Sequence, residues 1–84
     1  MPKIYVIGSI EIWIYFFDTK KHKSPHFHAV SPDGEMVVEI ASLEKLAKNM
    51  KVKQQKKVLD WAGSEEAAQL LKDSWNKCNP QQVM

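Results

Sequence analysis

All three histidines of this 84-residue chain lie within seven residues, His22-Lys-Ser-Pro-His-Phe-His28. Pro25 fixes its own φ and favours an extended conformation at the residue before it, so a strand is expected to begin directly after it. Residues two apart on a strand point to the same face, about 6–7 Å from each other. We therefore expect His26 and His28 to project together, with Phe27 on the opposite face.

Two imidazoles at this separation could act as a general acid and a general base on RNA. One would take the proton of a 2′-hydroxyl and the other would protonate the leaving oxygen, at a pH near the unperturbed pKa of histidine. Lys23 is predicted to stabilise the negative charge that develops on phosphorus. Lys20, Lys21 and His22, in the same loop, are candidate binding residues for the substrate. This chemistry requires no metal and no other cofactor.

Two other interpretations of the histidine pair stay open. A His-x-His segment on a strand can give two ligands to one metal ion, with His22, Asp18 or Glu39 as the third. No acidic residue accompanies the pair at close spacing, so this third ligand would have to fold back towards it. Alternatively, the two imidazoles could be structural, closing the edge of the core and hydrogen bonding to the backbone.

The turn Ser31-Pro-Asp-Gly34 determines which residues lie beside the histidines. If its two central residues form the loop, its ends pair with each other, and His26 lies opposite Glu39, whose carboxylate could orient an imidazole. If Gly34 is bulged, the pairing slips by one residue and both histidines lie on an apolar face. Turn chemistry favours the bulge, whereas the alternation of polar residues favours the first register.

The hydrophobic pattern predicts one α+β domain over residues 1–78. The expected strands are Lys3–Ile7, Ile10–Asp18, His26–Val30 and Glu35–Ile40, in a four-stranded and mainly antiparallel sheet. Residues 41–49 suit either a helical turn or a short strand. Two C-terminal helices follow, the first from about Val52 to Gly63, where we expect a left-handed cap, and the second from its Ser64 cap to Cys78. Residues 79–84 are expected to form a frayed tail.

The charge distribution limits the classes of partner. The net charge is +2, and all 12 basic residues are lysines. Six of these lysines lie between residues 45 and 57, a span that contains no acidic residue. Because arginine provides the bidentate contacts preferred by guanine and phosphate, its absence disfavours sequence-specific DNA recognition. Weak, salt-sensitive attraction to RNA, DNA or an acidic protein remains.

Size and cysteine content restrict the protein further. One cysteine, Cys78, excludes an internal disulfide and a four-cysteine zinc site, and we expect it to be a buried small hydrophobe. The beginning of the chain lacks the pattern of a signal peptide, and the longest apolar run is too short to cross a membrane. We therefore expect a cytoplasmic protein without membrane contact. A domain this small often gains stability by association, so a homodimer is compatible with its size.

Several of these features occur together in a known bacterial family. They are Met1-Pro2 before a short strand, Gly8, Tyr15-Phe16-Phe17, His22-x-x-Pro25-His26-x-His28, Asp33-Gly34-Glu35, and helices carrying Trp61 and Trp75. In this the chain resembles the domain of unknown function 4160 family, small proteins also called DhiT-like toxins, over about residues 1–77. Ser24 replaces one of two prolines that family members usually show, and Lys21 replaces a common acidic residue.

The resemblance implies the toxin of a bacterial type II toxin–antitoxin module, with an antitoxin protein encoded by a neighbouring gene. It does not imply a catalytic mechanism. We combine it with the residues in one leading hypothesis, an RNase-like toxin that uses His26 and His28 with Lys23. The alternatives are a non-catalytic module that binds protein or nucleic acid, and a small metal-binding domain.

Overall fold

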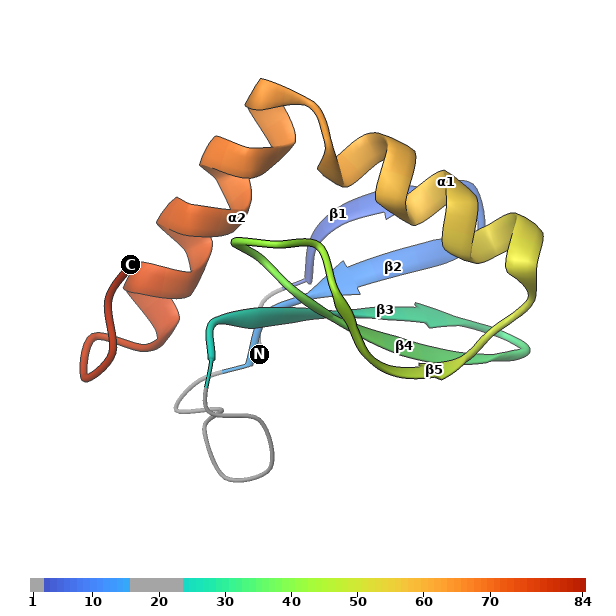
Figure 1. The fold of residues 1–84 in the computed structure, drawn as a ribbon, viewed down its shortest axis with the longest axis horizontal. Coiled ribbons are helices and arrows are strands. Elements are labelled where there is room, and N and C mark those ends of the chain that lie inside the picture. Colours follow the sequence, from blue (N-terminus) through green and yellow to red (C-terminus); the bar gives the residue numbers. More distant parts are fainter. Residues whose placement is uncertain (1–2, 16–23) are drawn as a thin grey trace.

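The computed structural model describes residues 3–15 and 24–84, and in them five strands precede two helices (Figure 1). The strands are β1 (Lys3–Ile7), β2 (Ile10–Trp13), β3 (His26–Ser31), β4 (Gly34–Glu39) and β5 (Lys45–Asn49), and the helices are α1 (Val52–Ala62) and α2 (Glu65–Cys78). The predicted α+β class, with an antiparallel sheet followed by two helices, is confirmed. The predicted number of four strands is wrong.

The fifth strand comes from the segment that suited either a helical turn or a short strand. β5 pairs antiparallel with β4, and Ala47 lies opposite Val37. Before it, Leu43 adopts φ +60°, in the left-handed region, and its amide donates to the carbonyl of Glu39 at 2.9 Å. This tight reversal interrupts a right-handed helix at Leu43 and returns the chain alongside β4, which explains why helical spacing was misleading here.

The sheet has the strand order β1-β2-β3-β4-β5, and each strand pairs antiparallel with the next one in the chain. β2 ends at Trp13, earlier than predicted, and residues 16–18 of the expected strand lie outside the described residues. In the hairpin of β3 and β4, Ser31 pairs with Gly34 and His26 pairs with Glu39. The unbulged register is therefore the one that forms.

Position 34 requires a glycine because the neighbouring strand approaches it closely, and not because of an unusual φ. A Cβ atom at this position would overlap the backbone carbonyl of Asn49, at the end of β5. The side chain of Ser31 donates to the carbonyl of Gly34 at 3.2 Å and closes the turn. Only glycine leaves room for β5 here, so the residue that made a bulge attractive in the sequence serves the packing of the sheet instead.

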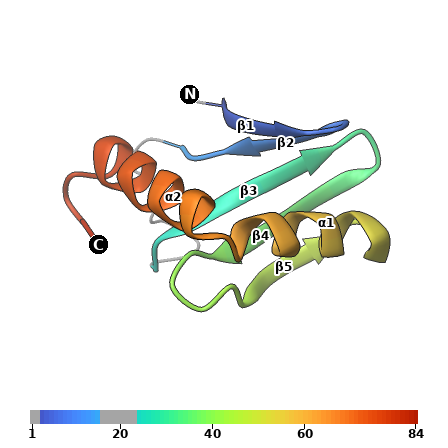
Figure 2. The ribbon, with the colours of Figure 1, turned by 90° about the horizontal axis from the view of Figure 1, so that it is seen from above.

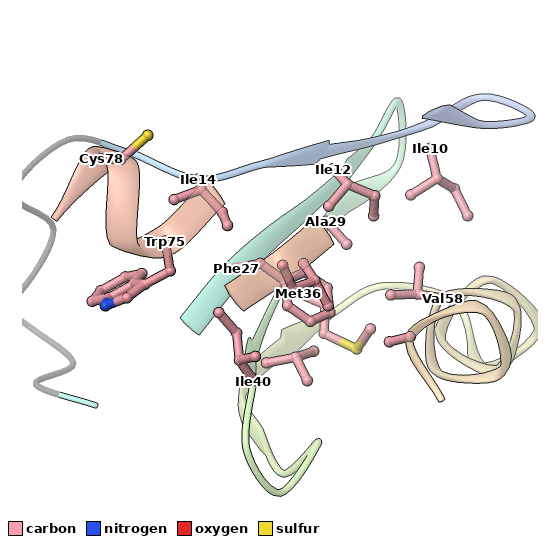
Figure 3. Packing of buried hydrophobic residues seen from close by; sticks show 13 residues of the cluster. Ile10, Ile12, Ile14, Phe27, Ala29, Met36, Ile40, Val58, Trp75 and Cys78 are labelled. Atoms are coloured by element: carbon pink, nitrogen blue, oxygen red, sulfur yellow. The ribbon is translucent and has the colours of Figure 1, made fainter. Parts of the chain in front are cut away.

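Both helices cover the same face of the sheet (Figures 1 and 2). We call this the helix face. Phe27, Ala29, Met36 and Val38 point from it into the core. The core cluster, shown in Figure 3, consists of Ile10, Ile12, Ile14, Phe27, Ala29, Met36, Val38, Ile40, Val58, Ala62, Leu71, Trp75 and Cys78. Such burial of one face is common in antiparallel sheets, whose other face need not be covered by helices. We call that other face, which carries His26 and His28, the histidine face.

The two helices are joined by a very short connection. The hydroxyl of Ser64 accepts the amide of Ala67 at 3.2 Å, so the predicted N-cap of α2 is confirmed. The predicted left-handed cap at Gly63 is wrong, because this residue has φ −75° and ψ −10°. Its amide donates to the carbonyl of Leu59, and the amide of Ser64 donates to that of Trp61. The chain thus leaves α1 by a right-handed turn that delivers Ser64 directly to the start of α2.

The residues after α2 contact the rest of the domain. Asn79 is fully buried, and its side-chain amide donates to the carbonyl of Tyr15 at 3.1 Å. The indole of Trp75 donates to the carbonyl of Gln82 at 2.7 Å. The expected fraying of residues 79–84 stays a prediction. Neither of the described helices has the length and apolar character that would let it cross a membrane.

Candidate functional site: a histidine pair on β3

His26 and His28 lie on the same face of β3, as their spacing predicts. Their register partners are Glu39 and Val37 on β4, and the residue between them, Phe27, is buried in the core on the helix face. The centroids of the two imidazole rings are 5.3 Å apart, with an angle of 63° between the ring planes. The rings therefore touch edge to face, close enough for both to act on one bound group.

His26 is the buried member of the pair, with 1% of its surface exposed. Its Nδ1 lies 2.7 Å from the backbone carbonyl of Ser24, which can only accept a hydrogen bond. Nδ1 therefore carries a proton, and Nε2 is the basic nitrogen of the neutral ring. The indole of Trp75, at the end of the sheet where β3 begins (Figure 3), packs against this imidazole with centroids 5.3 Å apart.

Pro25 explains why the carbonyl of Ser24 is available to His26. Proline has no amide hydrogen and keeps Ser24 extended, so the chain enters β3 in a fixed direction. The carbonyl of Pro25 accepts the amide of Ile40 at 3.0 Å, which ties this entry to the residue after β4. The Pro-His-x-His sequence thus positions the first imidazole through its own backbone.

His28 is held by a carboxylate instead of a carbonyl. Its Nδ1 lies 2.7 Å from Oε2 of Glu35, and its side chain is 11% exposed, whereas that of Glu35 is 48% exposed. The carboxylate fixes the proton on Nδ1 and stabilises the imidazolium that forms when Nε2 accepts a second proton. This is the arrangement that supports a histidine acting as a general base.

Glu35 was missed from the sequence. It lies opposite Val30, two positions along β4 from Val37, the register partner of His28. A diagonal neighbour on the same face is within reach of a long side chain. The signal was therefore present in the unbulged register, but that register could not be chosen from the sequence.

Glu39, which could orient an imidazole in this register, instead accepts hydrogen bonds from serine hydroxyls. Its Oε1 accepts the hydroxyl of Ser42 at 2.5 Å. Hydrogen bonds from the hydroxyls of Ser42 and then of Ser24 hold the pKa of this carboxyl below its ordinary value. Glu39 lies opposite His26 in the register, yet its carboxylate is stabilised by these two serines.

Aromatic residues surround the pair. The ring of Tyr15 lies 4.3 Å from that of His28, centroid to centroid, and 6.4 Å from the indole of Trp13. Trp13 is the register partner of His28 on β2, and its indole donates to Glu11 at 3.0 Å. Trp75 belongs to the core. Trp13, by contrast, forms part of the immediate surroundings of the histidines.

The predicted lysine partners of the histidine pair and the lysines between residues 45 and 57 belong to different parts of the chain. Lys20, Lys21, His22 and Lys23 all lie outside the described residues, so their predicted roles stay predictions. In the cluster of six lysines between residues 45 and 57, Lys45 and Lys48 pair with Val38 and Met36, which point to the helix face. The side chain of Lys45 accordingly donates to Gln55 on α1 at 3.1 Å. This cluster therefore lies on the opposite side of the sheet from the histidines.

Cys78 does not contribute to the site. It is 2% exposed and belongs to the core cluster, and burial raises the pKa of its thiol. Both features match the inert small hydrophobe that we expected. Over residues 3–15 and 24–84, no three side chains of histidine, cysteine, aspartate or glutamate are grouped so that they could hold a metal ion.

The fold and the site together define a small α+β domain whose central strand carries an oriented histidine pair. Residues 10–76 match the family described as Domain of unknown function (DUF4160), and the chain belongs to this family. The predicted family is thereby confirmed. No curated protein and no solved structure matches the chain.

Proposed function

We propose that this protein is the toxin of a type II toxin–antitoxin pair and that it cleaves RNA by general acid–base catalysis through His26 and His28. The observation that carries the catalytic part is the contact between His28 and Glu35, with His26 beside it. A carboxylate behind one imidazole and a second imidazole 5.3 Å away supply a base and an acid to the same phosphodiester.

The orientation of the two rings suggests their roles. Nε2 of His28 accepts the proton of the 2′-hydroxyl, because Glu35 stabilises the resulting imidazolium. The 2′-oxygen attacks phosphorus, the bond from phosphorus to the 5′-oxygen breaks, and protonated His26 gives its Nε2 proton to that oxygen. The products are a 2′,3′-cyclic phosphate and a free 5′-hydroxyl. Since His26 is 1% exposed, the substrate must displace a covering side chain to reach it.

Lys23 is the proposed partner of the phosphate. It precedes Ser24, whose carbonyl holds His26, so only two residues separate Lys23 from His26 in the sequence. A lysine there would neutralise charge that develops on the non-bridging oxygens. The toxin role itself rests on the resemblance to DhiT-like toxins, and the acidic partner expected for such a lysine-rich chain is the antitoxin.

Metal binding is the second candidate, and one observation favours it. Metal-ligating histidines usually donate their other ring nitrogen to a carbonyl or carboxylate, as His26 and His28 do here through Nδ1. Two ligands alone make a weak site, so a third would be needed. Zinc or nickel retained in equimolar amount after purification without a histidine tag would support this candidate.

A non-catalytic binding module is the third. The lysines of β5 and α1 lie on the helix side of the sheet and away from the histidines, so they could bind a polyanion on their own. Such binding would weaken steeply with salt and survive the loss of both histidines. It would make the histidine pair irrelevant to the partner.

The decisive experiment uses purified protein and two matched oligonucleotides, one all-RNA and one with 2′-deoxyribose at the cleaved position. We expect cleavage of the first, a 2′,3′-cyclic phosphate end, no cleavage of the second, and full activity in excess chelator. His28→Gln should abolish cleavage, whereas Lys57→Gln, a substitution of an exposed lysine on α1, should not. Cleavage that persists in His28→Gln would refute the catalytic proposal.

The toxin part is tested separately by expression in a bacterial host with and without the neighbouring gene. We expect growth arrest with the wild-type chain alone, relief by the neighbouring protein, and relief by His28→Gln at equal protein level. Arrest that continues with His28→Gln, in a chain that still folds, would contradict a catalytic toxin. No arrest by the wild-type chain would contradict the toxin role.

A further inference from the structure

The two outer strands of the sheet, β1 and β5, differ sharply in chemistry. β1 reads Lys-Ile-Tyr-Val-Ile, with apolar residues on both faces and one charge at its first position. Tyr5 is 44% exposed and Val6 is 48% exposed. Proteins usually protect an outer strand with charges, because its unpaired amides and carbonyls invite another strand. β1 lacks this protection after Lys3.

β5 has the protection that β1 lacks. It begins at Lys45 and carries Lys48, and Lys51 follows the strand after one intervening residue. Lysines of this kind discourage edge-to-edge pairing, because they resist desolvation and repel a second copy. The contrast between two outer strands of one sheet indicates that β1 is the edge on which a further strand is tolerated.

The hairpin geometry identifies which part of β1 would pair. Ile7 and Ile10 face each other across the two-residue turn Gly8-Ser9, and Gly8 has φ +60°. The residues that flank such a turn exchange their backbone hydrogen bonds, so Val6 directs its amide and carbonyl away from β2. A register shift between Lys3 and Tyr5 interrupts the strand before this point. The regular edge is therefore Tyr5 to Ile7, centred on Val6.

We propose that β1 pairs antiparallel with β1 of a second copy of this chain, with the two-fold axis at Val6. The strand is self-complementary, because it contains no acidic residue and its single cation is remote from the axis. Antiparallel pairing about Val6 places the two copies of Lys3 at opposite ends, about 20 Å apart along the strands. The two sheets then form one continuous sheet, and the helices of both copies lie on the same side of it.

A cavity beside β1 gives the second copy something to cover. It has a volume of about 190 Å³ and is lined by Tyr5, Trp61, Ser64, Glu66, Ala67 and Leu70. Tyr5 and Trp61 stack at its wall, with centroids 4.8 Å apart and ring planes 16° from parallel. In the pairing about Val6, Ile7 of the second copy lies opposite Tyr5 and on the same face. Its side chain then covers the exposed edge of the tyrosine at this cavity.

This inference does not depend on the proposed catalytic function. Its test is the mass of the full-length protein in solution, by sedimentation or light scattering from micromolar to millimolar concentration. We expect a dimer for the wild type and a monomer for Val6→Lys, because two lysines would face each other at the axis. Val52→Lys is the matched control, since Val52 is 79% exposed on α1 and should leave the dimer intact. Circular dichroism checks that each variant folds.

A second pair of variants tests the register directly. Cysteines directly opposite each other on antiparallel strands have Cα atoms about 5.5 Å apart, a distance that a disulfide can span. Under mild oxidation we expect rapid covalent dimers of Val6→Cys and slow or no dimers of Val52→Cys, while the native Cys78 is buried. A monomeric wild type at every concentration would overturn the proposal. So would a dimer that Val6→Lys leaves intact, or equal cross-linking of the two cysteine variants.

Discussion

His26 and His28 are the same residue type on the same face of one strand, yet they differ in burial and in the group that holds Nδ1. His26 is buried against Trp75 and is held by a backbone carbonyl. His28 is partly exposed beside Tyr15 and is held by the carboxylate of Glu35. A carbonyl fixes a tautomer but carries no charge, whereas a carboxylate also favours the charged ring.

The difference in burial predicts that the two rings contribute unequally to stability, although both take part in the proposed reaction. The environment of His26 holds its ring rigidly at the edge of the core, where the proposed reaction uses it as the proton donor, and that of His28 is the one expected for a proton acceptor. A catalytic pair needs both, since a rigid member next to a reactive one fixes the geometry of the site. Substitutions at the two positions and at the residues beside them should therefore produce unlike results, from large losses of stability to large losses of cleavage.

The largest loss of stability is expected for His26→Ala. This substitution removes a fully buried ring and leaves a cavity beside Trp75, so the free energy of unfolding should fall by about 2–4 kcal/mol. Urea denaturation at neutral pH measures this. A decrease below about 1 kcal/mol would mean that the burial of His26 is not structural.

His28→Ala should give the opposite pattern. The side chain of His28 is 11% exposed and its contact with Glu35 lies at the surface, so the free energy of unfolding should fall less than in His26→Ala, by about 1–2 kcal/mol. RNA cleavage should fall at least about 100-fold, as for loss of a general base. The two measurements are made on the same preparation. A large loss of stability without an effect on cleavage would contradict the role of His28 as the proton acceptor.

Glu35→Gln sharpens the distinction between orientation and charge. A glutamine can still accept the Nδ1 proton of His28, so the ring should keep its tautomer, but the charged ring loses its carboxylate partner. We expect cleavage to fall about 10-fold while the variant still folds. Cleavage rates and circular dichroism of the variant and the wild type measure both. An unchanged cleavage rate would show that the charge of Glu35 does not assist His28.

The smallest effect is expected for Ser42→Ala, which concerns the acid opposite His26. Because the pKa of Glu39 is lowered in the folded protein, its ionised form stabilises the fold above its ordinary pKa, and this contribution is lost as the pH falls through the folded pKa. Removing the largest cause should raise the pKa of Glu39 towards its ordinary value. The stability of the variant should then fall slightly below that of the wild type at neutral pH, and match it in strong acid.

An NMR titration of the Glu39 carboxyl in Ser42→Ala measures this pKa and also tests the relation of Glu39 to His26. A carboxylate released from Ser42 can turn towards its register partner, which would make the surroundings of His26 more like those of His28. A change in the ring signals of His26 in Ser42→Ala would reveal this. If the pKa of Glu39 does not change, the hydroxyl of Ser42 is not the cause of its low value.

Much of the fold followed from local patterns. Pro25 predicted the start of β3, the period of two predicted that His26 and His28 share a face, and Ser64 predicted the start of α2. Each of these depends on neighbours within a few positions in the chain. The family could also be predicted, because its most specific residues lie in the Pro-His-x-His segment.

What could not be predicted depends on contacts between distant residues. β5 forms because Leu43 reverses the chain and β4 offers an edge, which no helical or strand period in 41–49 reveals. The hairpin register is influenced by the approach of Asn49 to Gly34, 15 positions later. Glu35 becomes the partner of His28 only through that register. The prediction of the site therefore depended on the hairpin register, for which local turn chemistry favoured the wrong alternative.

The order of the strands has a consequence for how the chain folds. Since every strand pairs with its neighbour in sequence, the sheet has a low contact order and can form as successive hairpins. All five strands are complete by residue 49, before either helix has left the ribosome. Until then Phe27, Met36 and Val38 face water, so the nascent sheet is prone to aggregate. The two helices therefore cover the sheet only after it has formed with both histidines in place.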